Sequence, residues 1–418
     1  AILAGSTSTN GGNNTGWIFG AATYTWAGTT STSWGISSNW DLGAVPGSTD
    51  TAIIADVVND PLLAANTLVS TLTINSGAIL NLNNYTLTVT NIFTNNGIVT
   101  ASGSGTPITA GTLTTSNPSS SITYTGANNA VSVDVAGGTY GSLIINGPSD
   151  IFNLVGNIIV QSNLTITTGI LSAGARTITV AGNWSNSGGF SAGTSIVTFN
   201  GNNPSIISGA NTFYRLTCTT GGKTLSFASG VTQTVTNLLT LTGAAGSLIT
   251  LSRNGGSGQW YLNAPLSTSA NYVSVANSYS TNPITANNSN NAGNNNNWNF
   301  GSVAYSGGSF EGGFTPGAYD SVAVGSGTMT LSGVTNYQSL NINSGASLNL
   351  AGYNFSGNLT NSGNLILRGD ETITGTITHA PGSTVTYTGT SAYNTLRAGS
   401  SYQNLEFSGN GTWRPDAA

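Results

Sequence analysis

Hydrophobic and polar residues alternate one by one along short stretches of this chain. Examples are the stretches 72–74 (LTI), 87–89 (LTV) and 164–166 (LTI). An alternation of period two places apolar side chains on one face of an extended strand and polar side chains on the other face. No window shows a sustained apolar period of 3.6 residues, so we expect little helix. The pattern predicts an all-β protein built from short strands.

The strands recur in two motifs with glycine and asparagine at the corners. The first motif is an alternating strand that ends in glycine, a second strand, and an Asn-rich corner that ends in glycine. The second motif is an alternating strand that ends in glycine, followed by a strand led by an aromatic residue. They occur at 72–97, 164–188 and 340–363 for the first motif and at 121–145, 196–218 and 384–407 for the second. Glycine and asparagine tolerate the left-handed backbone that tight corners need.

A longer repeat contains these motifs. The stretch 12–20 returns as 293–301, and the stretch 72–78 (LTINSGA) returns as 340–346 (LNINSGA). The offsets are 281 (Trp298 against Trp17, 298 − 17) and 268 (340 − 72), so the second copy is shorter than the first. A long internal period indicates an array or solenoid.

The repeat predicts how the chain is organised. We expect residues 1–20 to be the end of a preceding unit and residues 302–418 to be the start of a second unit. Residues 21–301 then form one full unit, with sub-repeats near 72–147, 164–220 and 225–260. Both ends of the sequence fall inside the repeat, so we expect the functional protein to be longer.

Two all-β architectures fit short alternating strands with frequent turns. One is a parallel β-helix or β-solenoid, in which each turn of the chain stacks on the one before. The other is a series of tandem β-sandwich modules. The short strands, the Gly and Asn corners and a charged content of only 5% favour the solenoid.

Composition and charge narrow the classes of function. Nucleic-acid binding relies on clustered Lys and Arg, and the seven basic residues of this chain are scattered, so no nucleic-acid partner is expected. No stretch is apolar over 18 residues, so we expect no membrane span in this segment. Cys218 is the only cysteine, and its place in an alternating strand predicts a buried, unreactive thiol.

No arrangement of residues predicts catalysis, a cofactor or a metal site. Asp370 and Glu371 are the only adjacent acids, and the counterpart region of the first copy, 103–109, has no acid. Asp50 and Asp320 hold the same repeat position, which predicts a role in a corner. His379 is the only histidine and has no catalytic motif around it. We therefore predict that the chain is not an enzyme.

Aromatic residues are the better candidates for binding. Trp26, Trp34 and Trp40 lie in one Gly-, Ser- and Thr-rich stretch, and indole rings can stack on sugar rings. We name these three residues as a candidate carbohydrate or subunit contact. The alternative is that they pack over a flank of the solenoid.

The combination of these tryptophans with residues 45–47 (VPG), 72–78 and 87–89 resembles bacterial autotransporter passengers and filamentous-haemagglutinin-like surface proteins. The resemblance implies a secreted, right-handed β-helix with a role in surface structure or adhesion. We therefore expect an extracellular or cell-surface structural protein, a repeat segment of a fibre, sheath or surface layer that associates with itself. The alternative is the stalk of a cell-surface adhesin, with glycans as candidate partners.

Overall fold

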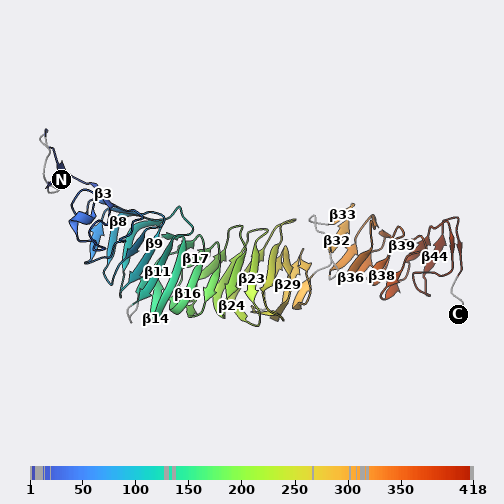
Figure 1. The fold of residues 1–418 in the computed structure, drawn as a ribbon. Helices are drawn as coiled ribbons and strands as arrows, with labels where there is room; N and C mark the ends of the chain where they lie inside the picture. Colours follow the sequence, from blue (N-terminus) through green and yellow to red (C-terminus); the bar gives the residue numbers. More distant parts are fainter. Residues whose placement is uncertain are drawn as a thin grey trace. The chain divides into compact units, whose positions relative to one another are not determined.

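The chain folds as an all-β parallel solenoid of about 17 turns with essentially no helix (Figure 1). The computed structural model describes residues 2–4, 13, 15–18, 20–126, 131–133, 138–265, 268–300, 303–306, 308–310, 316 and 320–414. By its packing the chain forms two compact units. Unit 1 comprises residues 1–240 and 253–265, and unit 2 comprises residues 241–252 and 266–418.

Unit 1 contains three groups of strands that pair in parallel, plus the short pair β1 (Ile2–Leu3) and β2 (Trp17–Ile18). The first group, in spatial order, is β10 (Ile108–Thr114), β8 (Leu87–Asn95), β6 (Thr71–Ile74), β4 (Thr51–Ile54) and β3 (Thr23–Trp26), with β5 (Thr67–Val69) beside β8. The second group is β7 (Ile79–Asn81), β9 (Ile98–Ser102), β11 (Ser121–Gly126), β14 (Ser142–Leu154), β16 (Leu164–Ser172), β18 (Trp184–Asn186), β21 (Ser205–Ser208) and β23 (Thr224–Ala228), with β12 (Val131–Val133) beside β14 and β19 (Gly189–Ser191) beside β16. The third group is β13 (Gly138–Tyr140), β15 (Ile158–Val160), β17 (Thr177–Val180), β20 (Ile196–Phe199), β22 (Asn211–Cys218), β24 (Thr232–Thr242) and β26 (Trp260–Asn263).

Unit 2 is also built from groups of short strands. Its first strands are β25 (Ile249–Asn254), β28 (Val273–Val275) and β30 (Asn290–Asn291), together with β27 (Ser269–Asn271), β29 (Ser278–Asn287) and β31 (Asn296–Phe300). A further group is β33 (Ser309–Phe310), β32 (Val303–Ser306), β34 (Ser321–Val324), β36 (Thr335–Ile342), β38 (Phe355–Asn361) and β40 (Ile373–Thr374), with β41 (Ile377–His379) beside β38. The last groups are β35 (Thr328–Thr330), β37 (Ser347–Asn349), β39 (Asn364–Leu367), β42 (Thr384–Tyr387) and β44 (Asn404–Phe407), and the pair β43 (Ala392–Tyr393) and β45 (Thr412–Trp413).

The hydrophobic core follows from the alternation in the sequence. In β6 the apolar side chains of Leu72 and Ile74 are completely buried, while those of Thr71 and Thr73 are partly exposed. Each inward position pairs with an inward position of the next turn, as Leu72 does with Ala52 and with Phe93. Stacking in register therefore turns a two-residue pattern into a continuous apolar interior.

The long repeat of the sequence is also a repeat of structure. Leu340 of β36 pairs with Val322 of β34, as Leu72 pairs with Ala52 in the first copy. The pairs are separated by 268 (340 − 72) and 270 (322 − 52) residues, close to the offsets of the sequence repeat. Equivalent residues therefore occupy equivalent positions in the solenoid.

The Asn-rich corners are built by the same hydrogen bonds in both copies. Asn95 and Asn361 are almost fully buried, at 2% and 0% exposure. The Oδ1 atom of each accepts the N–H of the glycine two residues on, Gly97 or Gly363, at 3.2 and 3.1 Å. The Nδ2 atom of each donates to a backbone carbonyl of the following turn, at 3.1 and 2.8 Å. One side chain thus closes a corner and ties it to its neighbour.

These observations confirm the predicted solenoid and show that the β-sandwich alternative is wrong, because neighbouring strands pair in parallel from turn to turn. The pair β32–β33 is an antiparallel hairpin, and the 3-10 turn η1 spans Ser37–Asn39. The predicted unit boundaries at residues 20 and 301 rest on the repeat in the sequence and not on the packing of the chain. They stay a prediction.

Candidate functional site

The three tryptophans of the candidate contact lie together in one buried cluster. The exposed fractions of Trp26, Trp34 and Trp40 are 0, 3 and 2%. The ring of Trp40 meets those of Trp26 and Trp34 edge to face, at centroid distances of 5.2 and 4.7 Å. The indole N–H of Trp26 donates to the carbonyl oxygen of Asn59 at 2.7 Å, and that of Trp40 donates to the carbonyl oxygen of Trp34 at 2.9 Å. These contacts favour the packing alternative.

A buried asparagine that the sequence analysis missed holds the loop over this cluster. Asn39 is fully buried, and its Oδ1 atom accepts the N–H groups of Thr30 and Ser31 at 2.9 and 3.0 Å. Its Nδ2 atom donates to the carbonyl oxygen of Ser33 at 3.0 Å. Trp34 borders a pocket of about 290 Å³ that is also lined by residues of 64–68. A carbohydrate or subunit contact at the three tryptophans stays a prediction.

The two aspartates at the same repeat position each hold a corner. Asp50 accepts the N–H of Ala22 at 2.9 Å through Oδ1 and the N–H of Gly47 at 2.8 Å through Oδ2. Asp320 accepts the N–H of Asn291 at 3.0 Å. Both side chains are buried, at 8 and 1% exposure. Asp134, Glu311 and Asp416 lie outside the described residues.

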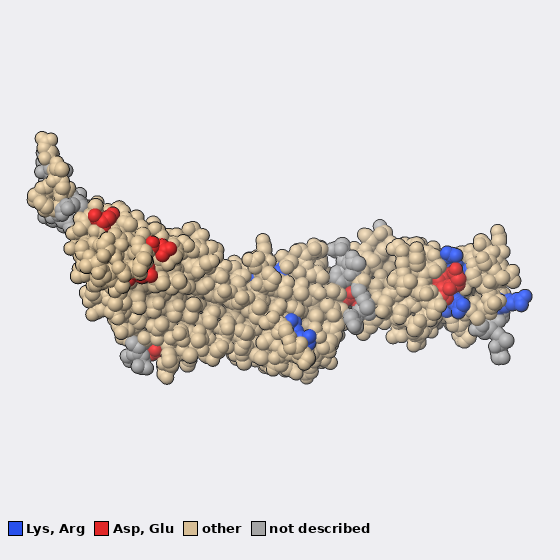
Figure 2. All heavy atoms as spheres, in the orientation of Figure 1, with Lys and Arg blue, Asp and Glu red and all other residues tan. Residues whose placement is uncertain are grey.

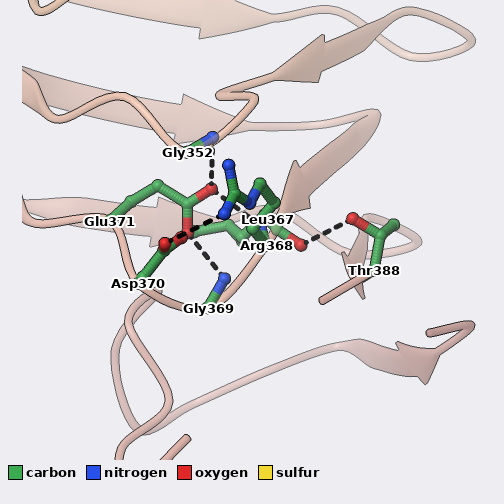
Figure 3. Close-up of polar contacts among 7 residues, drawn as sticks. All are labelled: Gly352, Leu367, Arg368, Gly369, Asp370, Glu371 and Thr388. Carbon is green, nitrogen blue, oxygen red and sulfur yellow. Dashed lines mark hydrogen bonds and ion pairs between the residues drawn. The ribbon is translucent and has the colours of Figure 1, made fainter. Parts of the chain in front are cut away.

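The only adjacent acidic pair forms a charged corner after β39 (Figure 3). Glu371 is fully buried, and its carboxylate accepts the N–H groups of Gly352 at 3.0 Å, Arg368 at 2.7 Å and Gly369 at 2.7 Å. Asp370 and Arg368 are about half exposed and pair with each other at 3.3 Å. A glycosidase needs two carboxylates that face one substrate. The carboxylates of this corner instead face donors of the protein itself, as a structural role requires.

A groove of about 520 Å³ lies beside this corner. It is lined by Thr372, Ile373, Gly375, Ile377, His379 and residues 395–401. We call it the His379 groove. The structure places His379, which is partly buried, in the wall of the groove.

His379 fixes the loop that forms the other wall. Its Nε2 atom lies 2.9 Å from the carbonyl oxygen of Ala398, and its Nδ1 atom lies 3.4 Å from Nδ2 of Asn361. A carbonyl oxygen only accepts and an amide nitrogen only donates, so this network assigns the proton to Nε2 and leaves Nδ1 as the acceptor. The imidazole ring also stacks on Tyr402 at a centroid distance of 5.6 Å. The side chain is therefore a tether between β41 and the 395–401 loop.

Two further titratable side chains are buried inside unit 1. Cys218 is fully buried, as predicted from its place in the alternating pattern. Lys223 is fully buried as well, which sequence reasoning did not predict. Burial raises the pKa of Cys218 and lowers the pKa of Lys223, because both changes favour the neutral form.

Charged side chains are sparse on the face drawn in Figure 2. Within the described ranges, no group of three or more His, Cys, Asp or Glu side chains is placed to hold a metal ion. In the same part of the chain, no helix is long and apolar enough to cross a membrane. Comparison with protein-family models, with curated proteins and with solved structures found no match.

Proposed function

We propose that this chain is a repeat segment of an extracellular structural protein, which forms part of a surface fibre, sheath or surface layer through self-association. The observation that carries the proposal is the repetition of the same bonds from turn to turn. Parallel strands stack in register, and corner side chains add hydrogen bonds between successive turns, as Asn183 N–H does to Asn163 Oδ1 at 2.9 Å. Such a stack resists local opening because each turn is held on both sides.

The surface chemistry supports the same role. Only 5% of the residues are charged, and the polar surface consists mainly of uncharged Ser, Thr and Asn. The interactions that hold the turns together are hydrogen bonds and apolar packing, which salt screens far less than it screens exposed ion pairs. The proposal includes a secreted origin, a right-handed coil, and kinship with autotransporter passengers and filamentous-haemagglutinin-like proteins.

Electron microscopy of the producing cells, labelled with an antibody raised against this chain, tests the proposal. Labelled fibres or a lattice with a regular axial repeat at the cell surface are the expected result. Label confined to the cell interior would contradict it. Isolated surface projections anchored at one end would favour the alternative, an adhesin stalk. The His379 groove is the observation that favours this alternative, because an adhesin needs a place for a ligand.

A further inference from the structure

The His379 groove has the dimensions and the chemistry of a ligand site. Its volume of about 520 Å³ lies within the range of small-molecule pockets, roughly 300–1,000 Å³. Among its twelve lining residues, Arg397 is the only Lys or Arg, and none is acidic. The local charge of the wall is therefore positive.

The guanidinium of Arg397 is available to a ligand. The side chain is exposed and makes no hydrogen bond or ion pair with the described residues. The acids of the neighbouring corner are already engaged, because Asp370 pairs with Arg368 and Glu371 accepts three backbone N–H groups (Figure 3). An unpaired guanidinium favours a planar carboxylate, which it can bind through two parallel hydrogen bonds.

The remaining wall suits a sugar ring. Ser400 and Ser401 are exposed and bring two hydroxyl groups to the wall. Ile373 and Ile377 supply aliphatic surface in the same groove. A pyranose presents hydroxyl groups at its rim and C–H groups on its faces, which matches hydroxyl donors next to aliphatic side chains.

We propose that the His379 groove binds an acidic saccharide, a pyranose that carries a carboxylate. Arg397 pairs with the carboxylate, Ser400 forms a hydrogen bond with a ring hydroxyl, and Ile377 packs on a C–H face. His379 is a positioning residue, since its bond to Ala398 holds the loop that carries Arg397. The inference goes beyond the structural role proposed above and does not depend on it.

Isothermal titration calorimetry on the full chain with an oligogalacturonate tests this inference. The matched ligand is the same oligosaccharide with its carboxylates methyl-esterified, which keeps the ring and removes the charge. The acid form is expected to bind about tenfold more tightly than the ester or better, as a charge-assisted pair requires. Arg397→Gln is expected to weaken binding of the acid form about tenfold and to abolish the preference for acid over ester.

Two further variants complete the test, one as a control and one at a second side chain of the groove. Arg176→Gln changes an exposed arginine that does not line the groove and is expected to leave the affinity unchanged. Ser400→Ala removes one exposed hydroxyl group of the wall and is expected to weaken binding about threefold to tenfold, as the loss of one neutral hydrogen bond does. Circular dichroism of each variant confirms that the solenoid is intact.

Several results would overturn the inference. Equal affinity for acid and ester would exclude recognition of the carboxylate. Inorganic phosphate or sulfate that binds as well as the oligosaccharide would show a general anion site rather than a saccharide site. No heat of binding with oligogalacturonate or with an oligoglucuronate, the second uronate tested, would exclude the proposed ligand class.

Discussion

The buried Nζ atom of Lys223 donates a hydrogen bond of 2.7 Å to the backbone carbonyl oxygen of Asn203, twenty residues earlier in the chain. The same Nζ atom donates to the carbonyl oxygen of Ala181 at 3.1 Å. These carbonyls belong to the corners after β20 and β17, which lie side by side in the third strand group of unit 1. One side chain therefore links three successive turns.

Lys223→Met keeps the apolar stem of this side chain but leaves both carbonyls without their donor. We expect a loss of about 1–3 kcal/mol in the free energy of unfolding, the usual cost of buried groups left unpaired. Urea denaturation followed by circular dichroism measures it. Arg176→Met, at an exposed arginine, is the control and is expected to change stability by less than about 0.5 kcal/mol. A Lys223→Met chain as stable as the parent would mean that the cost of burying the charge cancels the two bonds.

Stability at alkaline pH depends on Cys218. Burial raises the pKa of Cys218 above its ordinary value of 9.0, so above about pH 9 the unfolded chain holds fewer protons than the folded chain. The free energy of unfolding therefore falls as the pH rises above about 9. The lowered pKa of Lys223 acts in the opposite direction below 10.5, because there the unfolded chain holds more protons. We predict that Cys218→Val loses less stability than the parent between pH 8 and pH 10.

Thermal unfolding at a series of pH values compares the two proteins. Because Tyr24 and Tyr337, whose pKa values are also raised, are present in both, their contributions cancel in the difference. Parallel curves for parent and variant would show that the thiol of Cys218 does not contribute.

The charged corner predicts a contrast between two adjacent acids. Glu371→Gln places an amide nitrogen against one of the three N–H groups that the carboxylate accepts, and we expect a loss of about 2–4 kcal/mol. Asp370→Asn removes only the exposed pair with Arg368 and is expected to cost less than about 1 kcal/mol. Hydrogen exchange at the amide of Gly369 reports the corner directly. Similar losses in both variants would contradict the role assigned to Glu371.

Close stacking of the corners predicts a difference between two glycines. Gly209 and Gly230 both have a left-handed backbone, with φ of +79° and +71°. A Cβ atom at Gly209 would lie 1.9 Å from the carbonyl oxygen of Asn186, whereas one at Gly230 would meet nothing within 4 Å. Gly230→Ala is expected to cost about 1–2 kcal/mol from backbone strain alone. Gly209→Ala is expected to cost at least about 2 kcal/mol more, because the backbone has to move. Equal unfolding free energies for the two variants would contradict the close contact.

The strands and the core could be predicted from the sequence, because the side chains that decide them are neighbours in the sequence. Leu72, Ile74 and Cys218 are buried as their alternation predicts. The parallel pairing followed from the recurrence of short strands with Gly and Asn corners. The equivalence of Leu72 and Leu340 followed from their shared motif.

The polar interior could not be predicted in the same way. Asn39, Lys223 and Glu371 are buried because backbone groups elsewhere in the fold meet them. Glu371, for example, accepts a hydrogen bond from Gly352, nineteen residues earlier. The wall of the His379 groove joins residues of β41 to the loop at 395–401. No local sequence pattern indicates which loops contact each other, so this site could be identified only from the structure.

Several hydrogen bonds between corners join residues at the same separation in the sequence. Thr86 bonds to Asn66, Thr177 to Asn157, Asn183 to Asn163 and Lys223 to Asn203, each across twenty residues. An insertion of a single residue in a strand would turn every following side chain of that strand to the opposite face. An insertion or deletion of one whole turn would leave each remaining turn with suitable partners on both sides. The length of this protein is therefore a quantity that evolution or an engineer can change in whole turns, without redesigning the rest of the chain.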